Sequence, residues 1–137
     1  MQSVLAMRGH SRMADMYSAK LLDHFEHPRN AGDVPDATAS VEMSNPVCGD
    51  VVRFSARVVA GRIEEIRFRA KGCVPAMACA SAVTELVSGS DMDAARSLSR
   101  EDLELAVDGV PEASGHASQL AVEGLRKLLE KVKRSGG

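Results

Sequence analysis

The chain has 137 residues, of which 45% are hydrophobic and 26% are charged, which is the balance of an ordinary globular domain. A net charge of −2 argues against a nucleic-acid binder or a protein that docks on anionic membranes. The three cysteines are too few for a disulfide framework. We therefore expect a protein of a reducing compartment, in the cytoplasm, with no nucleic-acid or membrane partner.

The beginning of the chain differs from the rest. Residues 1–14 contain Arg8, His10 and Arg12 but no acidic residue, and the apolar run before Arg8 is too short for a secretory signal. We interpret residues 1–15 as a loose leader and residues 16–134 as a single domain.

The domain is predicted to open with a helix that Ser18 caps and Pro28 ends, because apolar residues recur at helical spacing between them. A turn-rich loop follows over residues 30–36. We interpret His24 and His27 as a surface pair on this helix, because no thiol or carboxylate is placed to complete a metal site with them.

Two adjacent runs with a period of two residues predict an antiparallel hairpin. Residues 51–59 run out and residues 62–70 run back, with a turn at Gly61. The first run puts apolar residues on one face (Val52, Phe54, Ala56 and Val58) and polar residues on the other, solvent-exposed face (Arg53, Ser55 and Arg57). A strand over residues 39–43 is expected to pair with this hairpin.

The second half of the chain is predicted to be helical over residues 76–87, 91–98, 99–107 and 118–133. The first of these helices has an apolar face (Cys79, Val83, Leu86 and Val87), and Cys79 is interpreted as an inert core thiol. Ser99 and Asp102 form a capping box. Because the strands precede the helices without βαβ alternation, we expect an α+β fold with helices on one face of a small antiparallel sheet.

The hairpin brings chemistry-bearing residues together. Cys48 and Asp50 precede its first strand and Cys73 ends its second, so all three converge at one end of the sheet. His116, expected in a loop before the last helix, is a candidate fourth ligand. Two thiolates favour zinc or iron. The residues alone leave open a second interpretation, in which both cysteines are structural and the histidine lies on the surface.

Three segments resemble the IscU/NifU-type family of iron–sulfur cluster scaffolds. They are residues 17–32 (YSAKLLDHFEHPRNAG), residues 45–50 (NPVCGD) and residues 71–73 (KGC). The match spans residues 16 to about 134, in the order and with nearly the spacings of the family. It implies a three-stranded antiparallel sheet with helices packed on one face.

The resemblance also implies a cluster site. Its positions fall on Cys48, Asp50, Cys73 and His116, with the two cysteines and the histidine as cluster ligands and the aspartate as a fourth, weak metal ligand. The family's third cysteine, which accepts sulfur from the desulfurase in many members, falls on Ala117. Residues 110–114 (VPEAS) replace the Leu-Pro-Pro-Val-Lys segment that Hsp70-type chaperones recognise, and only Pro111 is kept.

We therefore expect a scaffold or carrier, not an enzyme, that holds a transient cluster ([2Fe–2S]) or iron for transfer to apo-proteins. The resemblance implies a cysteine desulfurase and apo-protein acceptors as partners and does not extend to the chaperone. Two alternatives have the same fold: a mononuclear Zn²⁺-binding module with the same four ligands, and an interaction protein without metal or sulfur transfer. Fold-level likeness does not by itself decide among them.

Overall fold

The computed structural model describes residues 16–134, and the predicted leader lies outside them. The helices are α3 (Ala19–Glu26), α4 (Val74–Val87), α5 (Met92–Arg96), α6 (Arg100–Ala106) and α7 (Gly115–Arg134), with a short 3-10 turn, η2 (Glu112–Ser114), before α7. The strands are β1 (Ala39–Asn45), β2 (Asp50–Val59) and β3 (Arg62–Lys71). No helix in this described range is long and apolar enough to cross a bilayer.

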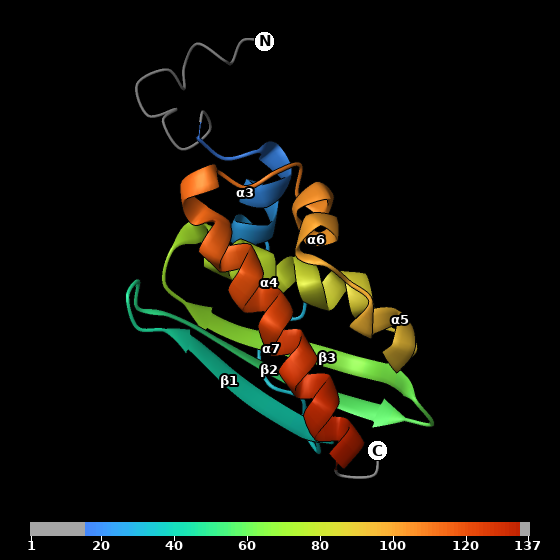
Figure 1. Cartoon of the computed structure of the whole chain (residues 1–137). Coiled ribbons are helices and arrows are strands. Elements are labelled where there is room, and N and C mark those ends of the chain that lie inside the picture. The colour runs from blue at the N-terminus through green and yellow to red at the C-terminus, as the bar shows by residue number, and fades with distance from the viewer. Residues whose placement is uncertain (1–15, 135–137) are drawn as a thin grey trace.

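The strands form one antiparallel sheet in the order β1-β2-β3. Phe54 in the central strand lies opposite Val41 in β1 and Phe68 in β3. Because side chains alternate between the two faces of a strand, Val52, Phe54 and Ala56 are all fully buried on one face. The helices lie on that face, with α7 running diagonally across the sheet (Figure 1). The predicted α+β fold is confirmed.

Helix α7 supplies much of the core. It packs on β1, β2 and α4, and its predicted apolar stripe is buried (Val122, Leu125, Leu129 and Val132). Full burial of one such side chain contributes about 1.5–3 kcal/mol to folding. Gly124 lies on the same face, where an added Cβ would come within 3.0 Å of the Phe54 ring. The small residue lets the helix approach the sheet closely.

The predicted helix caps are confirmed. The side chain of Ser18 accepts a hydrogen bond from the Leu21 N–H at 3.0 Å and so caps α3. Ser99 and Asp102 form the capping box of α6, in which each side chain accepts the other residue's backbone N–H. These bonds satisfy donors that the first turn of a helix otherwise leaves unpaired.

One prediction about the outer face of the sheet is wrong. Ser55 was expected on a solvent-exposed face, but it is only 3% exposed. The cause is the chain between α3 and β1, which crosses this face and buries Val34. The Val34 N–H donates to the Ser55 hydroxyl at 2.9 Å. Asp33, in the same segment, pairs with Arg53 and Arg69, so part of the outer face is covered.

Two predictions about helices are also corrected. Helix α7 begins at Gly115 rather than Ser118, because the turn η2 already winds the chain into helical geometry before it. Leu86 is 43% exposed, although it was predicted on the buried face of α4. Ten residues of α4 are buried, so apolar spacing does not single out one face of this helix.

Candidate metal centre

The end of the sheet where β2 begins and β3 ends brings Asp50 and Cys73 into contact. Val51 lies opposite Lys71 in the register, so the residues flanking this pair meet. Asp50 is 1% exposed, and its Oδ1 accepts the Cys73 N–H at 2.9 Å. The Cys73 Sγ lies 3.5 Å from Asp50 Oδ2. The convergence expected from the hairpin is therefore present for this pair.

Gly72 makes this contact possible. Its φ is +132°, and an added Cβ would stand 2.1 Å from Asp50 Oδ1 and 2.9 Å from the Asp50 Cα. The Asp50 backbone fills part of that space, and it cannot move aside as a flexible side chain could. Glycine is required here both for the backbone dihedral and for the close approach.

Cys48 lies in a tight loop that Asn45 organises. The Asn45 carbonyl accepts the N–H groups of Cys48 and Gly49 at 3.2 and 2.7 Å, and its side-chain Oδ1 accepts the Val47 N–H at 3.1 Å. Gly49 has a φ of +75°, which closes the turn into β2. Sequence reasoning did not assign a role to Asn45, although an asparagine two residues before a backbone donor is a known turn former.

His116 completes the cluster from the other side. It lies in the first turn of α7, not in the predicted loop, and its Nε2 is 3.3 Å from Asp50 Oδ2. One ligand atom from each of Cys48, Asp50 and His116 lies within 4.8 Å of the other two. Cys73 is outside this mutual group but contacts Asp50 directly. The other three predicted ligands therefore lie around the Asp50 carboxylate.

The thiols of Cys48 and Cys73 lie in different environments. Burial raises the pKa of the Cys73 thiol above its usual value, and the Asp50 carboxylate raises it further, because a neighbouring negative charge disfavours thiolate. Cys48 is exposed. A metal ion at this site would compete with a proton for Cys73, since the thiolate is the form that binds metals.

The remaining candidates lie outside this cluster. Cys79 is fully buried, and burial raises its pKa to about 12, which fits the interpretation of an inert core thiol. Ala117 is also fully buried, inside α7. His24 was expected on the surface, but it is 6% exposed. Its Nδ1 lies 2.8 Å from the Ser81 hydroxyl and its Nε2 3.2 Å from Glu85, so packing of α3 on α4 buries it.

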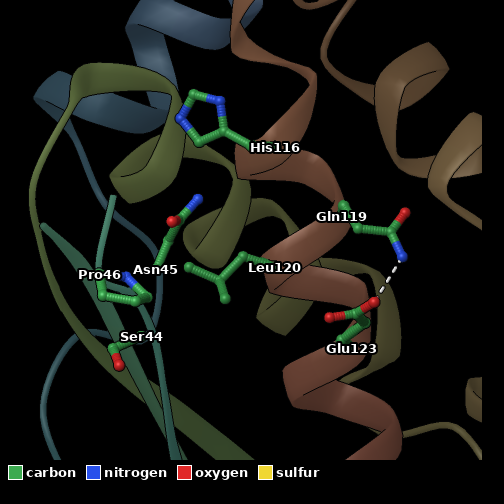
Figure 2. Close-up of a pocket in the computed structure, with 7 residues that line it drawn as sticks. All are labelled: Ser44, Asn45, Pro46, His116, Gln119, Leu120 and Glu123. Atoms are coloured by element: carbon green, nitrogen blue, oxygen red, sulfur yellow. Dashed lines mark hydrogen bonds between the residues drawn. The ribbon is translucent and has the colours of Figure 1, made fainter. Parts of the chain in front are cut away.

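A shallow pocket of about 220 Å³ adjoins the cluster and shares His116 with it. Figure 2 shows Asn45 and Pro46 facing Leu120 across this pocket, with His116 above them. Gln119 and Glu123, joined by a hydrogen bond, and Ser44 complete its lining. Except for His116, sequence reasoning did not identify these residues as a group, because they come from α7 and from the end of β1 with the residue after it, which are far apart in the sequence.

Residues 16–135 match the sequence family described as the NifU-like N terminal domain. The chain is 38% identical over 122 residues to the iron–sulfur cluster assembly scaffold protein IscU 1 of Archaeoglobus fulgidus, covering 89% of this chain and 80% of that protein. It is 34% identical over 121 residues to the scaffold protein IscU of Escherichia coli K12, covering 85% of this chain and 94% of that protein.

A solved structure has the same fold. The N-terminal NifU-like protein of Brucella abortus superposes with a TM-score of 0.71 at 18% identity, over 89% of this chain and 97% of that one. Together with the sequence matches, this likeness covers the helices, the sheet and the loops that bear the ligand candidates. The chain belongs to the family of NifU-like N-terminal domains.

Proposed function

We propose that this protein is an iron–sulfur cluster assembly scaffold, which holds a transient cluster as cargo and passes it to apo-proteins. The observation that carries the proposal is the grouping of Cys48, Asp50 and His116 within 4.8 Å, with Cys73 against the same carboxylate. Relatives that match this chain over most of its length are named iron–sulfur cluster assembly scaffold proteins. The role is one of binding and transfer rather than enzymatic turnover.

In this proposal Cys48, Cys73 and His116 are the principal ligands of a [2Fe–2S] cluster, and Asp50 is a weak fourth ligand. Thiolates hold iron strongly, whereas imidazole and carboxylate ligands change the potential and lability of a cluster. Asp50 also has a structural task, since its Oδ1 holds the Cys73 N–H. A carrier has to release its cargo, and a mixed ligand set favours release.

The proposal extends to partners and location. Sulfur would come from a cysteine desulfurase, and the cluster would go to apo-protein acceptors in the cytoplasm. Ala117 offers no thiol to accept sulfur. The exposed Cys48 would accept it instead: its thiolate would attack the outer sulfur of the desulfurase persulfide, and the S–S bond would break to release the desulfurase cysteine as a thiolate. We assign no Hsp70-type partner, since the chain lacks the family's chaperone-recognition segment.

A second candidate function, a mononuclear zinc module, has support from one observation. Cys48, Cys73 and His116 lie around the Asp50 carboxylate. Together with it they are four ligands of the types that tetrahedral zinc accepts. Zinc has no redox chemistry, and its binding would need no sulfide. The two functions therefore differ in the cargo that the same side chains hold.

Anaerobic reconstitution distinguishes the two functions. The purified protein is incubated with ferrous iron and sulfide, or with zinc, and metal and acid-labile sulfide are then measured. The scaffold proposal predicts equal amounts of bound iron and sulfide, a thiolate-to-iron charge-transfer spectrum, and passage of both to apo-ferredoxin. A colourless protein that retains one zinc ion and does not bind iron and sulfide would contradict the scaffold proposal.

A further inference from the structure

The ligand candidates are not equally accessible. Asp50 is 1% exposed and Cys73 is partly buried, so the side of the cluster formed by the strand ends is closed. Cys48 is exposed, and 31% of the His116 side chain is open to solvent. Among residues 16–134, the open approach to bound cargo is therefore on the side of Cys48 and His116.

The pocket of about 220 Å³ lies on that open side. It is open to solvent and has room for a small side chain. His116 belongs both to the pocket lining and to the ligand cluster. The pocket is therefore continuous with the candidate metal centre.

The pocket lining combines apolar and polar groups. Pro46 and Leu120 are the apolar residues of the lining (Figure 2). Asn45 uses its Oδ1 to accept the Val47 N–H, which leaves the amide Nδ2 as a donor without a hydrogen bond to any residue of 16–134. The Gln119–Glu123 pair supplies further polar groups on α7. Apolar surface with a few fixed polar groups is the composition of recognition sites.

We propose that this pocket, lined by Ser44, Asn45, Pro46, His116, Gln119, Leu120 and Glu123, receives a cysteine-bearing extended segment of the apo-protein acceptor. The inference rests on the proposed scaffold function and identifies where the acceptor binds. The acceptor must carry thiols, because thiolates are the ligands that hold iron–sulfur clusters.

This placement makes His116 the first ligand that the acceptor displaces. The acceptor thiol loses its proton to the buffer, its thiolate forms a bond to a cluster iron, and the bond from that iron to the His116 imidazole breaks. No oxidation state changes in this exchange. The same exchange then replaces the remaining ligands until the whole cluster belongs to the acceptor.

The test compares three tryptophan variants of the full chain, each loaded with cluster and mixed with apo-ferredoxin. Gln119→Trp fills the pocket. Glu130→Trp adds the same bulk to α7 three turns later, outside the lining. Val47→Trp adds it at the tip of the Cys48 loop, where Val47 is 91% exposed. Cluster content, cluster lifetime without acceptor, and transfer rate are measured separately.

We expect all three variants to load and retain the cluster like the natural chain, and only Gln119→Trp to slow transfer, by about tenfold or more, because small misplacements of reacting groups have effects of this size. Transfer by Gln119→Trp at the natural rate, or slowing by Val47→Trp alone, would overturn the inference and leave the scaffold function intact. Slower desulfurase-dependent assembly with unchanged transfer would assign the pocket to the sulfur donor and also overturn it. Failure of the natural chain to load would instead contradict the proposed function.

Discussion

Asp50 Oδ1 accepts the backbone N–H of Cys73 at 2.9 Å, while its Oδ2 lies 3.3 Å from His116 Nε2. One buried carboxylate thus links the strand end that carries Cys73 to the helix that carries His116. The hydrogen bond fixes where Cys73 enters α4, and the second oxygen faces the ligand cluster. A structural task and the proposed metal-binding task meet in a single side chain.

Replacement of Asp50 separates these two tasks. Asp50→Ala leaves the Cys73 N–H without its acceptor, and we expect a loss of about 1–3 kcal/mol in the free energy of unfolding. It also removes the proposed carboxylate ligand, which is harder than a thiolate, so a bound cluster should decay more slowly and transfer more slowly to apo-ferredoxin. Denaturant unfolding and the decay of visible absorbance measure the two effects.

Asp50→Asn is the matched control, because an amide oxygen can still accept the Cys73 N–H while the negative charge is lost. We expect it to recover most of the stability and to keep the slow transfer. Faster cluster loss in both variants would show that Asp50 is a holding ligand rather than one that eases release.

Gly72→Ala tests the close approach of the chain after β3 to Asp50. The new Cβ would stand 2.9 Å from the Asp50 Cα at a φ of +132°. Backbone strain alone costs about 1–3 kcal/mol, and the clash adds to it, so we expect the free energy of unfolding to fall by more than this strain. Metal binding should weaken as well. Gly32→Ala is the control, because Gly32 has a similar φ of +118° but no atom within 4 Å of the added Cβ. Equal losses from the two substitutions would show that dihedral strain, and not contact with Asp50, dominates at Gly72.

The hairpin end of the candidate site could be predicted from the sequence because β-strand geometry is local. A period of two residues with a turn at Gly61 fixes which strand ends meet, and Cys73 contacts Asp50 as that geometry requires. The turn of Asn45 and the buried environment of Ser55 could not be predicted in this way. The first is one side-chain hydrogen bond, and the second depends on a segment crossing the sheet from about twenty residues away.

Helix ends were harder to predict than strand pairing. His116 was expected in a loop, since Gly115 and Ser114 favour turns, but the turn η2 leads directly into α7.

The burial of His24 was also not predicted, because it depends on Ser81 and Glu85 in α4. Spacing within one helix does not report which other helix covers it.

The buried His24 predicts a pH dependence of stability. Burial and the nearby Arg29 lower the pKa of His24 despite the opposing charges of Glu85 and Asp23. A histidine whose pKa is lower in the folded state binds fewer protons there than in the unfolded chain. Its stabilising contribution is therefore complete above the unfolded pKa of about 6.5 and is lost as the pH falls through the folded pKa.

Chemical unfolding at pH values from about 7.5 to 5 measures this effect. We expect the free energy of unfolding to fall with pH in the natural chain and to depend less on pH in His24→Gln. A natural slope in His24→Gln would assign the pH dependence to other groups.

The central claim is that Cys48 and Cys73 hold the cargo and Cys79 does not. Circular dichroism in the visible range tests it most directly, because the signal arises only from a cluster held in an asymmetric protein site. After anaerobic reconstitution with iron and sulfide, the natural chain and Cys79→Ser should give the same cluster signal. Cys48→Ser and Cys73→Ser, each folded by its far-ultraviolet spectrum, should give little or none. A full signal from either of these two variants, or its loss in a folded Cys79→Ser, would contradict the account.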